Sequence, residues 1–358
     1  MAVDIDSVMI HYQAKINERL GLFFDEQIEE ASKISDYTRD VVANIKEYTL
    51  RGGKRLRPIF LIYGYKCLTE DDNIDAIIEA SISIELMQSY LLIHDDIMDE
   101  DELRRGKPTF HIEYKNICAA LFGEGEARKF GENMAILAGD LLEAYGMDVL
   151  TNSRFKEEYV KRALRKYTEI VKNVGYGQIL DIMSEKKKAI TEAEILLIHK
   201  LKTASYTIEN PLQIGAILAG AVEADLAVMS NYGLPLGLAF QIQDDILGLF
   251  GAEEKIGKPV GSDIREGKKT LLILHALSNC SEKEKGIITS ALGNADVTMA
   301  EIDTIRDIVR ETGSRDYSKR LVGEKIEEAI HAIERSNFRA EAKEFLVKIA
   351  DFVGVRDF

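Results

Sequence analysis

The sequence predicts an all-α protein, and two observations carry that prediction. Five prolines occur in 358 residues, where average usage would give about 18. The long segments between them repeat apolar residues at positions i, i+3, i+4 and i+7, as in residues 160–171 and 195–208, which is the spacing of helices that bury one face. The alternation of apolar and polar residues that is typical of strands is missing from the sequence.

The composition is that of a soluble globular protein. Apolar residues make up 46% of the chain, which is enough for a sizeable core. The formal net charge of -15 argues against nucleic acid as a partner. Three widely spaced cysteines without a CxxC pair indicate a reducing compartment rather than a disulfide framework or a zinc site. We see no signal-peptide pattern and no apolar run of about 18 residues that would span a membrane, so we expect a cytoplasmic protein.

Helical spacing defines the first half of the chain. Ser35 precedes Asp36 as an N-cap between the first two helices. The glycines of segment 51–58 permit unusual backbone angles, and Pro58 suits a first helical turn. The helices expected in this half cover residues 3–33, 36–50, 59–68, 74–102, 109–121, 127–152 and 154–172.

The second half continues the pattern. Another helix opens at Gly175, and Pro211 starts a segment rich in glycine and alanine, as expected where helices pack closely. The other expected elements are a helix at 191–208, a helix at about 225–250, a charged loop at 251–268 and four final amphipathic helices. Since no Ser-, Gly- or Pro-rich linker separates the halves, we predict one domain, residues 1–358.

One stretch of the sequence is strongly acidic. Between Asp95 and Glu102, six of eight residues are carboxylates, at a helix end whose dipole prefers cations. Asp95 and Asp99 lie one helical turn apart on the same face. Hard cations such as Mg²⁺ take oxygen ligands and share them with substrate phosphates. A solvated acidic helix end is the alternative interpretation.

A second copy of this stretch favours the metal site. Asp244 and Asp245 stand in the same Ile-x-Asp-Asp-Ile core about 150 residues later, again at the end of a long helix. Basic residues cluster at 54–57, 104–107 and 268–269, where they would form positive pockets in a negative surface. Paired acidic motifs with basic loops indicate a site for divalent metal together with a small polyanion.

Six motifs give the sequence its resemblance to one family. They are Gly52-Gly53-Lys54-x-x-Arg57-Pro58, Asp95-Asp96-x-x-Asp99 with Arg104-Arg105-Gly106, Gly177-Gln178-x-x-Asp181, Lys202-Thr203, Phe240-Gln241-x-x-Asp244-Asp245, and Gly257-Lys258-Pro259 with Gly267-Lys268. In order and spacing they are similar to the trans-isoprenyl diphosphate synthases, the polyprenyl synthetase family. The resemblance implies a bundle of antiparallel helices around a central cavity, usually as a homodimer. It also implies Mg²⁺-dependent condensation of isopentenyl diphosphate with dimethylallyl, geranyl or farnesyl diphosphate.

The resemblance assigns residues to the metal ions and to the allylic diphosphate. Two to three Mg²⁺ ions are expected on the principal ligands Asp95, Asp99 and Asp244, with Asp96 and Asp245 as secondary ligands. The allylic diphosphate is expected on Arg104, Lys202, Lys258 and Lys268, while Thr203 and Gln241 face the developing cation.

The resemblance also gives a second diphosphate site, with two departures from the family's pattern. Isopentenyl diphosphate is expected on Lys54, Arg57 and Arg105, because arginine matches phosphate oxygens with its planar fork. Gln88 stands where the family commonly has a histidine, and Gly248 stands where the second motif often has its last aspartate. Gln88 can still donate a hydrogen bond but carries no charge.

Product length is expected to depend on Tyr90. By resemblance this residue is the cavity floor, and an aromatic side chain there is similar to short-chain synthases that make geranylgeranyl diphosphate. Leu91 lies in line with Asp95 on the helical wheel and is the second residue assigned to chain length. Farnesyl diphosphate is the alternative product. His94, a histidine beside aspartates, is expected to pack rather than react.

Three other functions stay open. A terpene cyclase shares the acidic motif and the helical bundle, but it does not need the basic sites at 52–58 and 104–105. A catalytically silent partner subunit of a heteromeric synthase typically loses aspartates or basic residues, and nearly all of them are present here. A helical scaffold with acidic patches leaves the basic loops unexplained.

Overall fold

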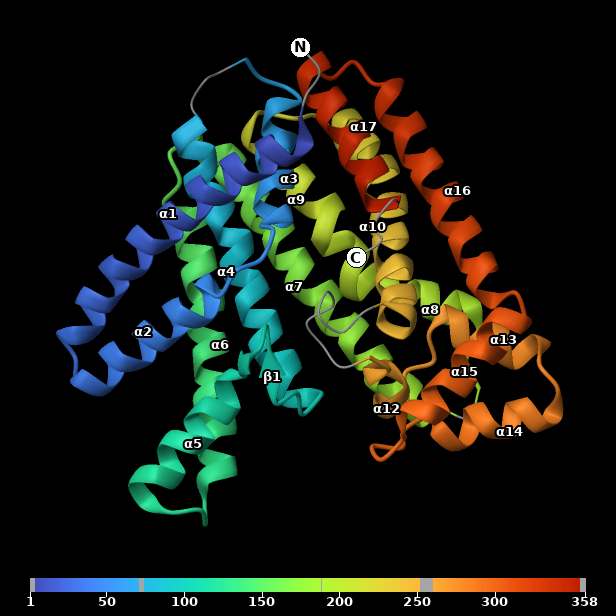
Figure 1. Ribbon diagram of the computed structural model, residues 1–358. Helices are drawn as coiled ribbons and strands as arrows, with labels where there is room; N and C mark the ends of the chain where they lie inside the picture. Colours follow the sequence, from blue (N-terminus) through green and yellow to red (C-terminus); the bar gives the residue numbers. More distant parts are fainter. Residues whose placement is uncertain (1–3, 71–73, 188, 252–259, 355–358) are drawn as a thin grey trace. The chain divides into compact units, whose positions relative to one another are not determined.

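The protein is helical, as the sequence predicts. The structure, a computed structural model, describes residues 4–70, 74–187, 189–251 and 260–354. Within these ranges the strands are β1 (Leu103–Arg104) and β2 (Lys107–Pro108), which form one small antiparallel hairpin. The other regular elements of the described chain are helices (Figure 1). The all-α fold class is confirmed.

The chain divides into two compact units, which we describe one at a time. The first contains Met1–Arg165 and Ile214–Gly220, and the second contains Lys166–Gln213 and Ala221–Phe358. The prediction of one domain stays a prediction.

The first unit holds the first acidic motif. Its helices are α1 (Ile5–Ser32), α2 (Asp36–Leu50), α3 (Leu56–Lys66), α4 (Ile74–Met98), α5 (Phe110–Phe122) and α6 (Ala127–Thr151). Ser35 begins α2 with a capping box to Thr38, so the predicted N-cap is confirmed. Helices α4 and α6 run side by side, and α5 packs on α6 (Figure 1).

Helix α4 is a core helix of this unit. It is long and apolar enough to cross a membrane, and 78% of that stretch is buried inside the protein. A helix that is apolar all round is typical of a protein core. The prediction that no apolar segment is long enough to span a membrane is therefore wrong for α4. Burial of this helix in the protein core explains its high hydropathy.

The hairpin replaces the end of a helix that the sequence extends to residue 102. Helix α4 ends at Met98, and Glu100 has a positive φ of 54°. Arg105 and Gly106 occupy the two turn positions with φ of 55° and 73°, as a two-residue type I′ turn requires. A short strand and a tight turn, rather than a helix, therefore present Arg104 and Arg105.

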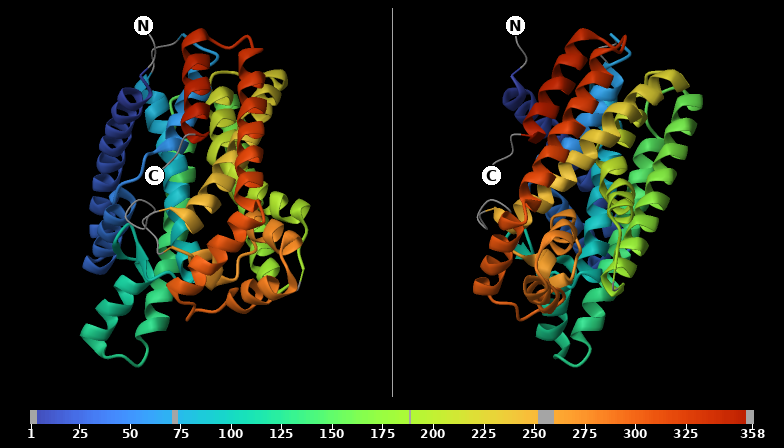
Figure 2. Two further views of the ribbon diagram at one scale, coloured as in Figure 1. Left: turned by 45° about the vertical axis from the view of Figure 1, so that its right-hand side comes forward. Right: turned by 90° about the vertical axis from the view of Figure 1, so that its right-hand side faces the viewer.

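The second unit holds the second acidic motif. Its helices are α7 (Glu157–Lys186) from residue 166 onward, α8 (Glu192–His199), the π-helix η1 (Lys200–Glu209), the first part of α9 (Asn210–Leu218), α10 (Glu223–Phe250), α12 (Ser262–Glu266), α13 (Leu271–Asn279), α14 (Glu282–Ala291), α15 (Met299–Glu311), α16 (Ser314–Glu334) and α17 (Ala340–Gly354). Helix α10 packs against α16 and α17 (Figure 2). The Tyr232 hydroxyl on α10 donates to the carbonyl of Leu346 on α17 at 2.7 Å.

Several boundaries in this unit differ from the predictions. Helix α7 passes through Gly175 without a break, because a single glycine costs a helix only about 1 kcal/mol. The segment expected as one helix at 191–208 is an α-helix followed by a π-helix. Helix α12 lies inside the expected loop 251–268, and in the described part of the chain five helices, not four, follow it.

Candidate active site

The first acidic motif lies where α4 ends. The backbone N–H of Asp99 donates to the carbonyl of Asp95 at 2.8 Å, so the helical turn continues past Met98 and keeps both side chains on one face. Both carboxylates are half-buried. Because a helix C-terminus carries negative potential, two carboxylates at this point favour a bound cation, and their oxygens suit Mg²⁺.

Asp96 is buried and has other partners. Its Oδ2 accepts a hydrogen bond from the Tyr48 hydroxyl at 2.8 Å, and its Oδ1 accepts one from Arg104 Nε at 2.6 Å. Burial raises the pKa of Asp96, while Arg104 and Tyr48 oppose that shift. Both oxygens are engaged by protein groups. Asp96 therefore anchors Arg104, and its role as a secondary metal ligand stays a prediction.

Arg105 lies over the glycine loop that precedes α3. Its Nη1 donates to the carbonyl of Gly52, and a Cβ added to Gly53 would lie 2.9 Å from its Nη2. Gly52 and Gly53 have φ of 110° and 109°, which side-chain-bearing residues rarely adopt. Glycine at both positions allows the loop to pass directly beneath the guanidinium.

The basic cluster at 54–57 divides into two parts. Arg55 turns into the core, where it is 3% exposed, pairs with the buried Glu85 and donates to Asn17. Arg57 is half-buried and Lys54 is exposed, so these two are the members of the cluster that an anion can reach. The sequence groups Arg55 with the positive pocket, but in the structure its side chain holds the loop from the core side.

Gln88 is buried on α4, two helical turns before Asp95. It lines a narrow pocket together with Tyr48, Arg51, Glu85, Ser89, Leu92, Arg104 and Arg105. The amide therefore lies beside the predicted arginines of both diphosphate sites, and it can donate to a phosphate oxygen without carrying charge.

The second unit has a polar pocket of its own, with a volume of about 130 Å³. Five of the predicted residues line it, namely Lys202, Thr203, Gln241, Asp245 and Lys268. Asp181, His199, Asp263 and Lys269 line it as well. Lys258, predicted for the same diphosphate, lies outside the described residues.

Asp245 is a buried carboxylate whose negative charge has few stabilising contacts. Its Oδ1 accepts from Gln241 Nε2 at 2.8 Å, and its Oδ2 lies 3.4 Å from His199 Nε2 without a hydrogen bond. Burial, followed by repulsion from Asp263 and Asp244, raises the pKa of Asp245 well above its ordinary value. Burial also lowers the pKa of His199 to about 4, so this imidazole is neutral at pH 7. A divalent cation would relieve the repulsion among these carboxylates.

Asp181 and Asp263 are carboxylates of this cluster that the sequence predictions leave out of the metal ligands. Asp263 lies in the sequence between the motifs at 257–259 and 267–268, and that position is the signal that could have identified it. A Cβ added to Gly248 would lie 3.2 Å from Asp263 Oδ2. Asp263 thus places a carboxylate next to the position where this chain lacks the last aspartate of the motif.

The π-helix η1 positions Lys202 and Thr203. Such turns are rare and often occur at functional sites. A Cβ added to Gly177 would lie 2.7 Å from the backbone N of Lys202, so α7 and η1 approach backbone to backbone. From there Lys202 Nζ reaches Asp181 Oδ2 at 2.8 Å. Two residues of the Gly177-Gln178-x-x-Asp181 motif therefore position Lys202. Gly177 allows its backbone to approach α7, and Asp181 binds its ammonium group.

Two lysines follow α12. Lys268 pairs with Glu266 and faces the pocket. Lys269 donates to the carbonyls of Ser184 and Glu185 at 3.2 and 3.1 Å, where a cation compensates the C-terminal end of α7. Both lysines line the pocket, but Lys268 pairs with a carboxylate whereas Lys269 binds the end of a helix.

His94 packs between α4 and α6. Its Nε2 lies 3.1 Å from the carbonyl of Ile136, and its ring occupies the space that a Cβ on Gly139 would need. These contacts are those of a packing residue, as the sequence predicts.

Tyr90 is half-buried on the side of α4 that faces α6. Its ring lies edge-on to His94, with centroids 5.0 Å apart. Burial, followed by Glu143 and Asp140 of α6, raises the pKa of Tyr90. Leu91 is also half-buried. The two residues assigned to chain length lie one turn below Asp95, and their roles stay predictions.

Comparison with known families decides the identity. The polyprenyl synthetase family model matches residues 39–309. The chain belongs to the polyprenyl synthetase family. The predicted resemblance is confirmed, and so is the prediction of a trans-prenyltransferase.

Relatives of this polyprenyl synthetase include enzymes with two product lengths. The geranylgeranyl diphosphate synthase of Sulfolobus acidocaldarius is 37% identical over 292 residues, or 81% of this chain and 82% of that protein. The geranylfarnesyl diphosphate synthase of Aeropyrum pernix is 33% identical over 306 residues, or 84% of this chain and 90% of that protein. A solved structure of geranylgeranyl pyrophosphate synthase from Corynebacterium glutamicum, complexed with isoprenyl diphosphate and magnesium, has a TM-score of 0.92 at 30% identity. It covers 99% of this chain and 100% of its own.

The carboxylates of this polyprenyl synthetase fit a divalent cation. Among the described residues, no three His, Cys, Asp or Glu side chains converge into a closed metal site. Mg²⁺ usually binds through one or two carboxylates together with substrate phosphates. Asp95 and Asp99, two half-buried carboxylates on one helix face, have the ligand type and number that this chemistry uses.

Proposed function

We propose that this polyprenyl synthetase makes geranylgeranyl diphosphate by Mg²⁺-dependent condensation of isopentenyl diphosphate with allylic diphosphates. The observation that carries the proposal is that each unit pairs an acidic motif with a cation anchored on a carboxylate. Arg104 is anchored by Asp96, and Lys202 by Asp181. Carboxylate oxygens suit metal ions, while anchored cations can neutralise the remaining phosphate charge.

The proposed roles at the allylic diphosphate follow from the family resemblance. When bound, two to three Mg²⁺ ions would act as Lewis acids on the departing diphosphate. The residues that would hold them are Asp95 and Asp99 in the first unit and Asp244 in the second. Arg104 and Lys202, with Lys268 and Lys258, would neutralise the same leaving group. Because Arg104 and Lys202 are already fixed by carboxylates, little reorganisation is needed as charge develops.

Isopentenyl diphosphate would bind at the glycine loop and the hairpin. Arg105 and Arg57 offer planar forks that match phosphate oxygens, with Lys54 as a point charge and Gln88 as a neutral donor. Placing a second diphosphate here distinguishes a condensing enzyme from a terpene cyclase, which needs one. Retention of these basic residues also argues against a silent partner subunit.

The carbocation would be stabilised by neutral oxygens. The amide nitrogen of Gln241 donates to Asp245, so its oxygen is the end that can face positive charge. Thr203 lines the same pocket and supplies a hydroxyl. The departing diphosphate is the proposed acceptor of the proton, since the family's pattern assigns no protein base.

Geranylgeranyl diphosphate is the product we propose because of Tyr90. An aromatic residue one turn below the first acidic motif would stop a growing prenyl chain, and Leu91 would line the same space. Farnesyl diphosphate is the shorter alternative. The relative in Aeropyrum pernix, named for geranylfarnesyl diphosphate, makes a longer product the other alternative.

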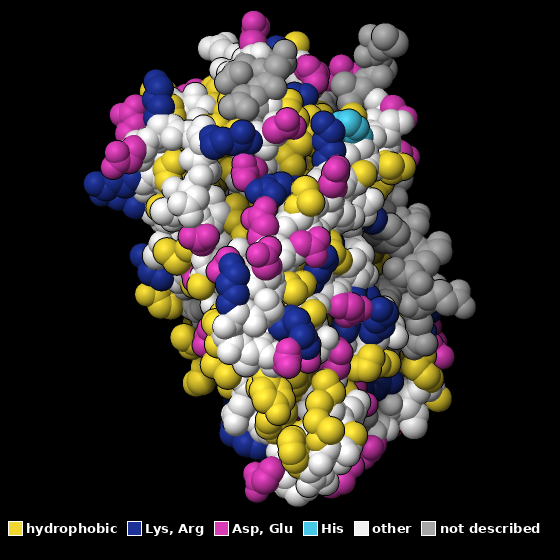
Figure 3. Space-filling model, turned by 90° about the vertical axis from the view of Figure 1, so that its left-hand side faces the viewer, with side chains coloured by type: hydrophobic (Ala, Val, Ile, Leu, Met, Phe, Trp, Pro, Cys, Tyr) yellow, Lys and Arg dark blue, Asp and Glu magenta, His cyan; other side chains and the backbone are white. Residues whose placement is uncertain are grey.

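We also propose a homodimer formed through the face of α5 and α6. Leu137 and Leu141 lie one turn apart on α6 and are 56% and 38% exposed, while Leu121 and Phe122 at the end of α5 are 68% and 78% exposed. Figure 3 shows apolar side chains gathered on the lower part of this face. A contiguous apolar patch indicates an interaction site, and a second copy would bury it in a self-complementary contact. Light scattering should give twice the chain mass, and Leu137→Glu with Leu141→Glu should give a monomer.

A reducing, cytoplasmic location is part of the proposal. Cys67 and Cys118 are buried, and all three cysteines are free thiols. Burial raises the pKa of Cys67 to about 12, so this thiol is inert toward oxidation.

One assay tests the proposed reaction. The purified chain is incubated with Mg²⁺, labelled isopentenyl diphosphate and allylic primers of increasing length, and the products are analysed by mass. We expect geranylgeranyl diphosphate, with no turnover in EDTA. A farnesyl or geranylfarnesyl product would overturn the proposed chain length alone, whereas no elongation of any primer would overturn the proposed condensation.

A further inference from the structure

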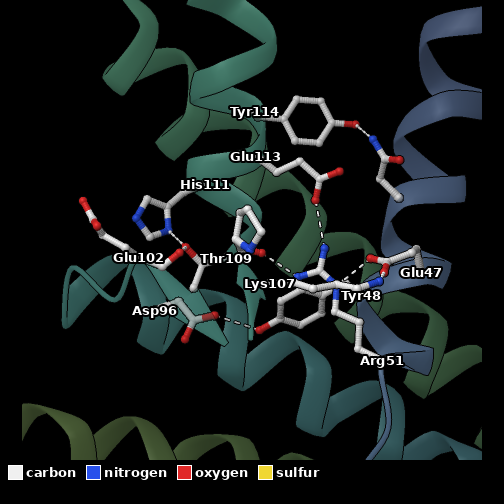
Figure 4. Close-up of polar contacts among 12 residues, drawn as sticks. Glu47, Tyr48, Arg51, Asp96, Glu102, Lys107, Thr109, His111, Glu113 and Tyr114 are labelled. Atoms are coloured by element: carbon white, nitrogen blue, oxygen red, sulfur yellow. Dashed lines mark hydrogen bonds and ion pairs between the residues drawn. The ribbon is translucent and has the colours of Figure 1, made fainter. Parts of the chain in front are cut away.

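Arg51 is an arginine that the proposed reaction does not use, although it directly precedes the glycine loop. Its side chain is only 5% exposed. Nε donates to Glu47 Oε2 at 2.5 Å, Nη1 to the carbonyl of Pro108 at 2.5 Å, and Nη2 to Glu113 Oε2 at 2.9 Å. One guanidinium therefore joins the end of α2, the second strand of the hairpin and the start of α5 (Figure 4).

The loop and the hairpin hold each other reciprocally. Arg51 at the loop donates to a hairpin carbonyl, that of Pro108. Arg105 at the hairpin turn donates to a loop carbonyl, that of Gly52. We call these two contacts the arginine clasp. Lys107 of the hairpin adds a third tie, since its Nζ donates to Glu47 Oε1 at 2.6 Å.

The clasp sets the distance between two groups of phosphate-binding residues. Lys54 and Arg57 follow the loop, and Arg105 belongs to the hairpin, so one diphosphate must contact both segments. Arg51 borders the pocket that holds Arg104 and Arg105, but each of its three nitrogen atoms donates to a protein group. Its Cζ lies 5.3 Å from the ring centroid of Tyr48. Charge-assisted hydrogen bonds of this kind fix geometry as well as adding energy.

Arg104 depends less on the clasp. It is held by Asp96, and Asp96 is held in turn by the Tyr48 hydroxyl on α2. Loss of Arg51 should therefore disturb Arg105 and the loop more than it disturbs Arg104.

We propose that Arg51 is a positioning residue that sets the isopentenyl diphosphate site by clasping the glycine loop to the hairpin. The inference rests on the proposed function, because it takes isopentenyl diphosphate as the ligand of Lys54, Arg57 and Arg105. According to this proposal, Arg51 affects the binding of isopentenyl diphosphate but not that of the allylic diphosphate.

The test compares the two substrates in three variants. Arg51→Lys keeps the charge but has one donor nitrogen in place of three. Arg51→Gln removes the charge, and Glu113→Gln weakens one contact while Arg51 stays in place. We expect the KM for isopentenyl diphosphate to rise about tenfold in the first two variants and less in Glu113→Gln. The KM for the allylic primer and kcat should change less than about twofold. If Arg51→Gln fails to fold, the other two variants carry the test.

Arg39 provides a matched control on α2, the helix that ends directly before Arg51. Its guanidinium pairs with Asp36 and Asp40 at the surface, so Arg39→Gln should leave both KM values unchanged. Equal rises in both KM values, or a lower melting temperature with both KM values unchanged, would overturn the positioning role. Calorimetric binding of isopentenyl diphosphate to the wild type and to Arg51→Lys separates this proposal from the proposed reaction. A wild type that does not elongate any primer would refute the reaction, while weaker binding in the variant would still support the clasp and equal binding would refute it.

Discussion

Asp96 and Arg104 form a buried ion pair between the end of α4 and the first strand of the hairpin. Nε and Nη2 of Arg104 both contact Oδ1 of Asp96, and the Tyr48 hydroxyl takes the other oxygen. The middle aspartate of the acidic motif thus orients a cation, whereas Asp95 and Asp99 on either side of it are the proposed metal ligands. We therefore expect the motif to combine two functions in five residues.

Replacing Asp96 should separate these functions. In Asp96→Asn the neutral amide holds Arg104 weakly, so the KM for the allylic diphosphate should rise about tenfold while the Mg²⁺ concentration for half-maximal rate stays the same. Asp99→Asn should raise that Mg²⁺ concentration. Steady-state kinetics at several Mg²⁺ concentrations distinguish the two variants. Glu102→Gln, at an exposed position, is the control. An Asp96→Asn enzyme that needs more Mg²⁺ would show that Asp96 is a metal ligand instead.

Shortening Tyr90 should lengthen the product. Tyr90→Ala removes the aromatic ring one turn below the acidic motif, and a prenyl chain could then extend past it. Mass analysis of the product should show at least one additional five-carbon unit. Tyr37→Ala, at a residue 85% exposed, serves as the control and should leave the product unchanged. If Tyr90→Ala also leaves the product unchanged, Tyr90 is not the floor.

Lys202 should be needed for turnover rather than for folding. Lys202→Gln removes a cation from the second-unit pocket, and loss of such a group costs about 10²–10³ in kcat. Asp181→Asn should have a smaller effect of the same kind, because the lysine remains but loses its anchor. Lys187→Gln, which breaks an exposed pair with Glu194, is the control. Melting temperatures should stay close to that of the wild type in all three, and a Lys202→Gln enzyme with wild-type kcat would contradict the assignment.

Gly139 should not tolerate a side chain while His94 is present. Gly139→Ala would place a methyl group in the imidazole ring, and overpacking of a core typically costs about 1–3 kcal/mol. Denaturant unfolding measures the loss, and His94→Ala in the same chain should recover part of it. Gly21 is a matched control on α1, since its Cβ would meet nothing within 4 Å. Gly21→Ala should be neutral or stabilising by about 0.5–1 kcal/mol, and an equal loss at both positions would rule out the steric explanation.

His111 should make stability fall at mildly acidic pH. Burial lowers the pKa of His111, with Glu132 opposing and Arg128 reinforcing that shift. The pKa of a histidine in the unfolded chain is about 6.5, so burial of the neutral imidazole contributes its full stability above that pH. This contribution is lost as the pH falls through the lower pKa that His111 has in the folded protein.

The measurement is the melting temperature between pH 7.5 and 5. The wild type should lose more stability over this range than His111→Asn, which does not titrate. His331→Gln, at a side chain 66% exposed, should follow the wild type. A parallel decline in the wild type and His111→Asn would show that other groups cause the acid sensitivity.

Much of the fold and of the site could be predicted from local patterns. Helical periodicity gave the all-α class, and the Ser35 N-cap was found because capping depends on neighbours in sequence. Five of the predicted residues of the second unit, Lys202, Thr203, Gln241, Asp245 and Lys268, line one pocket, although their motifs are far apart in the sequence. Element ends were less predictable, since the hairpin after Met98 and the π-helix at 200–209 depend on packing against other segments.

Residue type alone did not distinguish cations at the site from cations in the core. Arg55 and Arg57 are two residues apart, yet Arg55 is buried on Glu85 and Arg57 is half-buried. Nothing in the sequence marks Arg51 as the residue whose hydrogen bonds reach Pro108 and Glu113, because those partners are about 60 residues away. Sequence patterns identify the chemistry that a segment carries, not the distant group that each side chain contacts.

The sequence by itself determined the helical class, the two acidic motifs, the basic loops and the family. These depend on periodicity, residue type and spacing, which are properties of neighbouring residues. Only the tertiary structure decided that Asp96 anchors Arg104, that Asp263 joins the second carboxylate cluster and that the arginine clasp ties the loop to the hairpin. The physical reason is that a carboxylate can bind either a metal ion or a cationic side chain, and a guanidinium can bind either a phosphate or a carboxylate. Folding makes the choice, because it decides which partner lies within hydrogen-bond distance.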